Sequence, residues 1–220
     1  MTGARFDPIA PHYRWMESVL AGKKLQRARL RWIDEASQSR HILLAGEGHG
    51  RFLVECRKRI PKARITVVDS SLRMLEIARR ELRAETVAGG PQVEFLHASL
   101  PEWTPDADAF DLVVTNFFLD CFPPPALQRV VTTLAQSCRD QGRWLVSEFH
   151  VPPHGWRRWR ARAILASAYS FFRIATRLPA RALPDYSPLL ESASLQLERR
   201  SLSEWGLLTS ELWVKRQPTH

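Results

Sequence analysis

The chain has 220 residues, 45% hydrophobic and 25% charged, which suits one well-cored globular domain and excludes a disordered or low-complexity chain. No apolar run approaches the roughly 20 residues that a membrane-spanning helix needs, and the N-terminus lacks a secretory signal pattern, so we expect a cytoplasmic protein. The net charge of +9 invites a nucleic-acid partner, but most of the excess is local, since seven arginines and no acidic residue lie between residues 155 and 184.

Residues 6–36 predict two helices that join near Ala21 and Gly22. The first helix carries apolar residues at helical spacing, namely Ile9, Tyr13, Met16 and Leu20. The second covers residues 23–35 and places Leu25, Leu30 and Ile33 among basic residues.

The stretch HILLAGEGHGRFL, residues 41–53, predicts a strand, a glycine turn and a helix. Its apolar run at residues 42–45 is typical of a strand buried on both faces of a parallel sheet. Such a unit binds nucleotides, because glycines let the backbone approach a ligand and the following helix points its N-terminal amides at the same place.

Glycine spacing and the next strand decide which nucleotide is expected. The dinucleotide fingerprint is G-x-G-x-x-G, but here the third glycine comes one residue early and Arg51 occupies the reserved place. A second strand at residues 64–68 ends in Asp69, about 20 residues after the turn, where a βαβ unit delivers a carboxylate to ribose hydroxyls.

The G-x-G-x-G turn resembles motif I of the class I S-adenosylmethionine-dependent methyltransferases. The run DSSLRMLEIAR from Asp69 to Arg79 is similar to the D-x-S-x-x-M-L-x-x-A-R run of the ubiquinone/menaquinone-biosynthesis-like branch (methyltransferase type 11/12). This resemblance implies an α/β fold, a Rossmann-like seven-stranded sheet of order 3-2-1-4-5-7-6 with helices on both faces. It also implies a single methyltransferase domain over residues 1–220, divided into an N-terminal helical lid (1–38), a cofactor-binding core (39–151), a basic amphipathic helix insertion (152–184) and closing strands (185–220).

The resemblance assigns contacts with the cofactor, S-adenosyl-L-methionine, to matching positions. Three glycines (Gly46, Gly48 and Gly50) would shape the turn around the methionine part, and Glu47 would meet its ammonium. Asp69 would bind the ribose hydroxyls, with Ser70 and Met74 beside the adenosine and with Ala98 and Ser99 at the edge of the adenine. The segment FDPIAPHY resembles the family's Y-D-x-I-A-x-x-Y opening, so Tyr13 would close over the cofactor or face the substrate; the alternative is a half-buried packing aromatic.

Two positions depart from the family pattern. The family carries an acidic residue two places before the first glycine, where this chain has Leu44. It also has G-D-A after the third strand, here residues 93–96, where this chain has His97-Ala98-Ser99; we expect His97 to be a polar cap. These departures keep open a second interpretation, a non-catalytic S-adenosylmethionine- or nucleotide-binding protein on the same fold.

The fourth strand, residues 109–116, matches the family's F-D-x-V pattern and leads into NFFLD. Asn116 and Phe117 would line the path to the sulfonium, and Phe118 and Asp120 would face the substrate. Core packing of one of the two phenylalanines is the alternative. The segment is not N-P-P-Y or D-P-P-Y, which disfavours methylation of nucleobases or protein amides.

A fifth strand at residues 144–149 ends at His150, our candidate for a general base, with His154 as the weaker one. Alignment of donor and acceptor does most of the work in methyl transfer, and a base helps only where the acceptor must lose a proton.

Residues 155–178 predict a long helix with Arg158, Arg162, Arg173 and Arg177 on one narrow face and with Trp156 and Ile164 among the apolar residues opposite. Three interpretations stay open. The helix packs on the sheet or covers the acceptor pocket; it rests on an anionic membrane surface, which suits a lipid-like acceptor; or it binds nucleic acid, the least favoured because no recognition module accompanies it.

The sequence therefore predicts methyl transfer from S-adenosylmethionine to a small or lipophilic acceptor, with O-, N- and C-methylation all open. An NAD-dependent oxidoreductase is disfavoured by Arg51. The three cysteines (Cys56, Cys121 and Cys138) share no metal-ligand spacing, so we expect reduced thiols and no metal.

Overall fold

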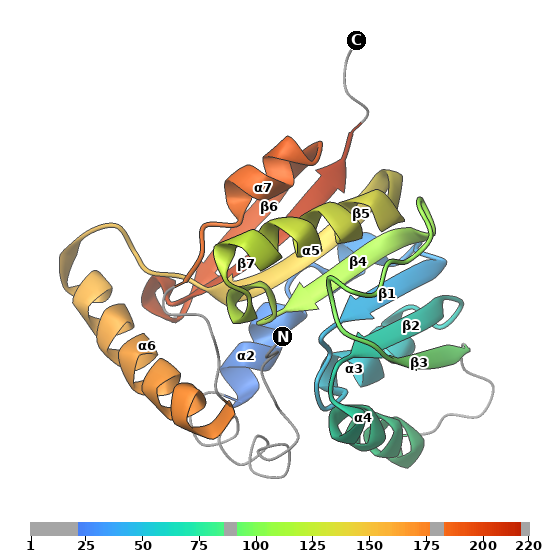
Figure 1. The fold of residues 1–220 in the computed structure, drawn as a ribbon, viewed down its shortest axis with the longest axis horizontal. Coiled ribbons are helices and arrows are strands. Elements are labelled where there is room, and N and C mark those ends of the chain that lie inside the picture. Colours follow the sequence, from blue (N-terminus) through green and yellow to red (C-terminus); the bar gives the residue numbers. More distant parts are fainter. Residues whose placement is uncertain (1–21, 86–91, 177–182, 217–220) are drawn as a thin grey trace.

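The computed structural model describes residues 22–85, 92–176 and 183–216, and these form a seven-stranded sheet with helices on both faces (Figure 1). The strand order is β3-β2-β1-β4-β5-β7-β6, as the sequence predicts. Strands β1 to β5 pair in parallel, and β7 pairs antiparallel with both β5 and β6. The strands are β1 (His41–Ala45), β2 (Arg64–Asp69), β3 (Val93–His97), β4 (Phe110–Asn116), β5 (Cys138–Phe149), β6 (Leu195–Ser203) and β7 (Leu208–Lys215).

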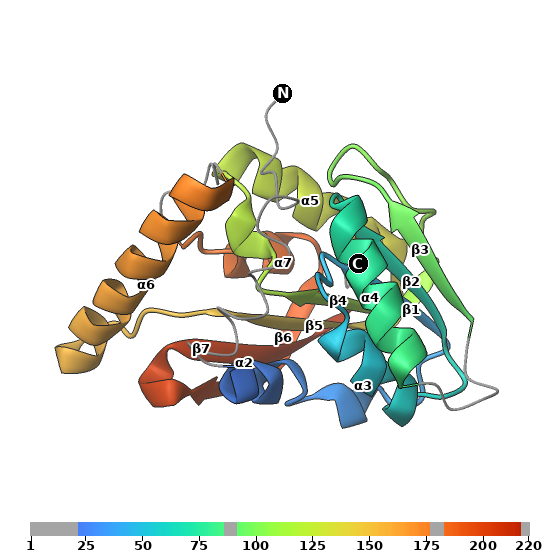
Figure 2. The ribbon, with the colours of Figure 1, turned by 90° about the horizontal axis from the view of Figure 1, so that it is seen from below.

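Alternation along β1 explains why its residues 42–45 are all apolar. Ile42 and Leu44 pack on one face of the sheet, and Leu43 and Ala45 pack on the other. The first face is covered by the helices η1 (Ile33–Ala36), α3 (Arg51–Arg59) and α4 (Leu72–Ala84). The second is covered by α5 (Pro124–Ser137) and α7 (Ser187–Ser192), as Figure 2 shows from below.

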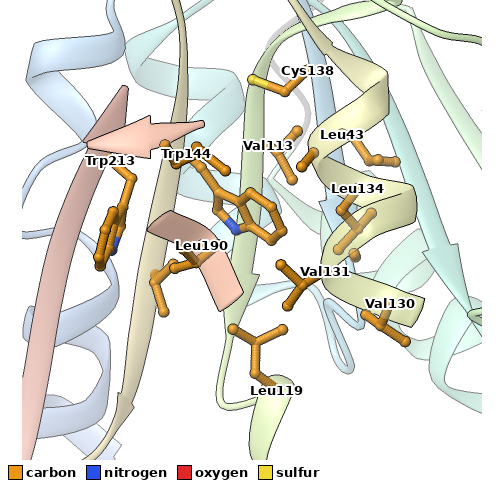
Figure 3. Close-up of a cluster of buried hydrophobic side chains, with 14 of the residues drawn as sticks. Leu43, Val113, Leu119, Val130, Val131, Leu134, Cys138, Trp144, Leu190 and Trp213 are labelled. Atoms are coloured by element: carbon orange, nitrogen blue, oxygen red, sulfur yellow. The ribbon is translucent and has the colours of Figure 1, made fainter. Parts of the chain in front are cut away.

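Two tryptophans anchor the core on the α5 side (Figure 3). Trp144 of β5 and Trp213 of β7 are both fully buried and lie with Leu190 of α7. A buried indole N–H needs an acceptor. Trp144 Nε1 donates to Thr115 Oγ1 at 3.0 Å, and Trp213 Nε1 donates to Glu211 Oε2 at 2.8 Å, so both requirements are met.

The structure corrects two expected element bounds. The helix predicted over residues 23–35 breaks into α2 (Gly22–Arg29) and the short η1, with Leu30, Arg31 and Trp32 between them. The indole of Trp32 reaches over and donates to the carbonyl of Ser210 on β7 at 2.9 Å, which ties this connection to the sheet. Strand β5 begins at Cys138, six residues before the predicted start.

Candidate functional site

The carboxyl ends of β2, β1 and β4 lie side by side at one edge of the sheet, because these strands are parallel neighbours. Gly46 follows β1, Asp69 ends β2 and Asn116 ends β4. Open parallel sheets bind ligands at this edge. The topology therefore brings together the residues to which the sequence assigned cofactor binding.

The three glycines of the turn after β1 have positive φ angles of 67°, 67° and 87°. A Cβ at Gly46 would lie 2.0 Å from Cδ2 of Phe118, and a Cβ at Gly50 would lie 2.8 Å from Cα of Ala78. A Cβ at Gly48 would meet nothing within 4 Å. The outer two glycines are thus required for close packing inside the protein, whereas Gly48 presents an open side on which a ligand fits.

Glu47, inside the turn, caps the helix that follows. Its Oε1 accepts the backbone N–H groups of Phe52 and Leu53 at 2.9 and 3.0 Å, satisfying two of the free donors of the first turn of α3. Burial raises the pKa of Glu47 to about 7, and the Leu53 amide and the Arg29 charge only partly oppose this.

Asp69 is half-buried at the end of β2 and is bonded to the turn itself. Its Oδ2 accepts the N–H of Gly48 at 3.1 Å, and its Oδ1 accepts the N–H of Ser71 at 2.8 Å. The Asp69 carboxylate therefore links Gly48, whose outer side is open, to the position predicted for the ribose.

The segment after β3 lies beside Asp69. The N–H of Ala98 donates to the carbonyl of Asp69 at 3.2 Å. Nε2 of the exposed His97 lies 3.1 Å from the carbonyl of Ser70 and must be the donor, so His97 is a polar cap. Ser99 is exposed.

Met74 is 3% exposed in the first turn of α4, where its N–H donates to Ser71 Oγ at 3.2 Å. That bond makes Ser71 the N-terminal cap of α4.

Two features at the end of β4 indicate a ligand site. Asn116 is 8% exposed, and neither its Oδ1 nor its Nδ2 has a hydrogen-bond partner among the described residues. Phe117 has a φ of 53°, which is unfavourable for a residue with a Cβ, and its ring lies between Phe149 (5.0 Å between centroids) and the guanidinium of Arg29 (5.3 Å). Buried unpaired amides and left-handed aromatic residues concentrate at functional sites.

Phe118 is the phenylalanine that packs. Its ring lies against Gly46, meets Phe122 edge to face at 5.0 Å, and joins the core on the α5 side. It therefore closes the inner wall between the glycine turn and the segment after β4.

Sequence reasoning missed Glu148, which lies on β5 and is 1% exposed. Its Oε1 accepts the N–H groups of Phe118 and Leu119 at 2.9 and 2.8 Å and so fixes the segment after β4, while Oε2 has no hydrogen-bond partner among the described atoms. Burial, and then the carboxylate of Asp120, raise the pKa of Glu148 well above its usual range. The only signal in the sequence is a carboxylate within the apolar strand WLVSEF.

His150 follows β5 and is bonded to the turn before β7. Its Nδ1 lies 2.8 Å from the carbonyl of Gly206, and its N–H donates to the carbonyl of Leu207 at 2.8 Å. Because a carbonyl only accepts, Nδ1 is the donor in this bond. His154 is exposed. Tyr13 and the first predicted helix lie outside the described residues.

Comparison with known proteins agrees with this geometry. A family described as "Methyltransferase domain" matches residues 42–142. Trans-aconitate 2-methyltransferase of Azoarcus sp. (strain BH72) is 31% identical over 190 residues, covering 77% of this chain and 68% of that protein. Demethylmenaquinone methyltransferase of Clavibacter sepedonicus is 34% identical over 91 residues, 41% of this chain and 34% of that protein.

Solved structures share the fold. The 1,6-didemethyltoxoflavin-N1-methyltransferase of Burkholderia thailandensis, solved with bound 1,6-didemethyltoxoflavin and S-adenosylhomocysteine, matches with a TM-score of 0.66 at 18% identity, over 95% of this chain and 86% of that one. In three other alignments with curated relatives the matched stretch covers only 25% to 41% of the relative. The match that spans two thirds of the Azoarcus enzyme, together with the domain match over the glycine turn and Asp69, shows that the chain belongs to the class I S-adenosylmethionine-dependent methyltransferases.

Proposed function

We propose that the protein transfers the methyl group of S-adenosylmethionine to a small or lipophilic acceptor. The observation that carries this proposal is the bond between Asp69 and Gly48: one carboxylate is fixed against the one glycine of the turn whose outer side is open. A turn without side chains beside a carboxylate suits an adenosyl ligand with ribose hydroxyls. The cofactor supplies an activated methyl group on a sulfonium when bound.

On the cofactor side, Gly48 would let the methionine part approach the backbone, and Oε2 of Glu47 would meet its ammonium. Asp69, held at the end of β2 by the N–H groups of Gly48 and Ser71, would bind the ribose hydroxyls. Ser70 and Met74, at the start of α4, would lie beside the adenosine. Ala98 and Ser99 would edge the adenine without the carboxylate that the family pattern has there, so polar contacts would come from Ser99 and the backbone.

On the acceptor side, Asn116 offers a donor and an acceptor that nothing in the described chain uses. Phe117, Phe118 and Asp120 would form the wall around the transferred methyl group, and an aromatic face there favours a positive sulfur. His150, with Nδ1–H held by Gly206, would accept a proton at Nε2 where the acceptor is a phenol or amine.

The acceptor class is inferred from two supports. The relatives act, by their names, on trans-aconitate, demethylmenaquinone and malonyl-[acyl-carrier protein], so small and lipid-linked acceptors occur among similar proteins. The arginine-rich helix α6 (Gly155–Thr176) follows the carboxyl end of β5, the sheet edge that carries the site. We propose that it contacts an anionic membrane, which would suit a lipid-like acceptor rather than nucleic acid.

Isothermal titration with S-adenosylmethionine, S-adenosylhomocysteine and NAD tests the cofactor. Micromolar binding of both adenosyl ligands and none of NAD is the expected result, followed by screening of quinone-like and lipid acceptors. Absence of adenosyl binding would favour the alternative, a non-catalytic protein on the same fold in which Leu44 and Ala98 report a lost site. Binding of NAD alone would favour an oxidoreductase.

Asp69→Ala tests the ribose contact. Loss of hydrogen bonds to a charged group should weaken S-adenosylmethionine binding by about 10- to 100-fold. Asp111→Ala is the matched control, because Asp111 also accepts backbone N–H groups, from Arg40 and His41 at 3.0 and 3.1 Å, but at the other end of the strands. Equal affinity in wild type and Asp69→Ala would refute the role of Asp69.

A further inference from the structure

Three tryptophans of the described chain are exposed, and two of them are in contact. Trp156 and Trp159 near the start of α6 are 60% and 71% exposed, and Trp205 in the turn before β7 is 58% exposed. The ring centroids of Trp156 and Trp205 lie 5.7 Å apart. Trp159 comes three residues after Trp156, so it lies on nearly the same side of the helix. Contiguous exposed aromatic surface of this kind marks an interaction site.

Helix α6 turns its aromatic side outward. Ala161 and Leu165, one turn apart, are buried at 1% and 5% exposure. At about 100° per residue, Trp156, Trp159 and Ala163 fall on the opposite side of the helix. Ile164, which the sequence grouped with Trp156 on the apolar side of the helix, is also exposed, at 37%. In Figures 1 and 2 the helix stands at the flank of the α/β core.

The third tryptophan is held in place by an unfavourable backbone. Glu204 and Trp205, in the turn η3 (Glu204–Gly206), both have left-handed φ angles, 53° and 63°. Residues with a Cβ keep this conformation only where the surroundings enforce it. Here Lys24 pairs with the Glu204 carboxylate, Arg160 donates to the Glu204 carbonyl at 3.3 Å, and His150 bonds the Gly206 carbonyl. Trp205 is therefore fixed beside Trp156.

The surroundings of the three rings are cationic. The guanidinium of Arg157 lies 5.9 Å from the Trp156 ring and 5.6 Å from the Trp205 ring. Arg158, Arg160 and Arg162 follow, and the sequence has no acidic residue between 155 and 184. Glu204, the acidic residue next to Trp205, forms an ion pair with Lys24.

We propose that Trp156, Trp159, Trp205 and Arg157, here called the tryptophan patch, dock the protein on an anionic phospholipid surface. Tryptophan prefers the boundary between headgroups and acyl chains, and arginines are attracted to anionic headgroups. A helix with rings flanked by arginines on its outward side lies in the plane of that boundary. No helix in the described part of the chain is long and apolar enough to span a bilayer. Docking through the tryptophan patch would bring the site to a lipophilic acceptor that resides in the membrane. This purpose rests on the proposed function, whereas lipid binding by the patch is tested independently of it.

The experiment is co-sedimentation of the full chain with phosphatidylcholine vesicles, with and without phosphatidylglycerol. Binding should require phosphatidylglycerol and weaken with added salt. Because each arginine near such a surface contributes about fivefold in affinity, Arg157→Glu/Arg162→Glu should bind at least about 25-fold more weakly. The triple variant Trp156→Ala/Trp159→Ala/Trp205→Ala should lose more than about tenfold, since three boundary-seeking side chains are removed. Arg80→Glu and Leu72→Ala, exposed positions on α4, are the matched controls and should bind like wild type.

Several outcomes would overturn the proposal: no binding of wild type to phosphatidylglycerol vesicles, equal binding by the patch variants, or equal losses in the α4 controls. A wild-type dimer in sedimentation velocity that becomes monomeric in the triple variant would also overturn it, because the patch would then be a self-interface. S-adenosylmethionine titration on the same samples separates this proposal from the proposed function. The patch variants should keep wild-type cofactor affinity, and loss of cofactor binding by wild type would count against the proposed function alone.

Discussion

At the residue scale, the proposed contact between Glu47 and the cofactor ammonium predicts that cofactor binding depends on pH. Its pKa of about 7 means that much of the carboxyl is protonated at neutral pH, whereas a ligand ammonium requires the ionised form. We expect S-adenosylmethionine affinity to rise by up to about tenfold per pH unit between pH 5.5 and 7 and then to level off. Titration calorimetry at half-unit steps measures this. Glu47→Gln keeps the oxygen that caps α3 and should flatten the dependence; a slope unchanged in this variant would exclude Glu47 as the responsible group.

Glu148 should make stability depend on pH in a predictable direction. Its native pKa is raised above the unfolded value near 4.5, so above pH 4.5 the folded state retains a proton that the unfolded state releases, and stability falls as pH rises. Glu148→Gln keeps an acceptor for Phe118 and Leu119 and removes the charge. The difference in unfolding free energy between Glu148→Gln and wild type should therefore shift in favour of the variant as pH rises, by at most about 1.4 kcal/mol per pH unit.

Urea unfolding of wild type and Glu148→Gln at pH 5 and pH 8 measures this shift in relative stability. Glu198→Gln, an exposed change on β6, is the control and should show no such trend. If Glu148→Gln is less stable relative to wild type at pH 8 than at pH 5, the ionised carboxylate is stabilising, contrary to this argument.

The individual residues of the site were predictable from sequence to different degrees. Gly48 and Asp69 belong to one continuous βαβ unit, so their spacing along the chain is enough to bring them together. Glu148 and Asp120 come from segments 28 residues apart that meet only because β5 pairs with β4. No local pattern encodes that meeting, so the carboxylate that fixes the segment after β4 escaped prediction.

At the scale of the element, two glycines of the turn after β1 are expected to differ in role, with Gly50 needed for folding and Gly48 for cofactor binding. Gly50→Ala would place a Cβ 2.8 Å from Cα of Ala78 and force α3 and α4 apart, in addition to the left-handed backbone cost of about 1–2 kcal/mol. Gly48→Ala would carry the backbone cost alone, because nothing lies within 4 Å of its Cβ. We expect Gly50→Ala to lower Tm clearly more than Gly48→Ala, and Gly48→Ala to weaken cofactor binding more than its Tm change suggests.

Thermal unfolding with and without S-adenosylmethionine checks both variants. If Gly48→Ala binds the cofactor like wild type, the open side of the turn is not where the ligand lies. If the two variants have the same Tm, the close approach of Ala78 does not govern the turn.

The elements themselves followed from sequence where period and propensity agreed. The buried strand β1 and the amphipathic α4 are such cases, with Met74 and Leu75 inside as their spacing requires. Helix α6 was predicted as a helix, but its orientation was not. Periodicity groups residues on a face without saying which face is covered, and here Ala161 and Leu165 are covered while Trp156 and Trp159 are not.

At the scale of the whole molecule, the candidate cofactor site and the start of the arginine-rich helix α6 lie at the same edge of the sheet. The parallel strands β1 to β5 all end at this edge, where Asp69 and Asp120 also lie. Helix α6, which carries the arginines, leaves from the same edge, because it follows β5 after only a short connection. The excess positive charge therefore lies on the helix that follows β5, outside the candidate site. A site so arranged suits a cationic sulfonium inside and an anionic surface outside.

This arrangement predicts that a membrane changes how the acceptor is reached but not how the cofactor is bound. With a long-chain quinol as the probe acceptor, dispersed in phosphatidylglycerol vesicles, the triple tryptophan variant should show a KM raised by about tenfold or more, in line with its lost lipid affinity. With a short-chain, water-soluble quinol it should match wild type, because the groups at the strand ends are untouched. Assays of methyl transfer from labelled S-adenosylmethionine with both acceptors measure the split. A variant impaired equally with both quinols would mean that the tryptophans act on the site itself, since lipid docking can affect only an acceptor that resides in the bilayer.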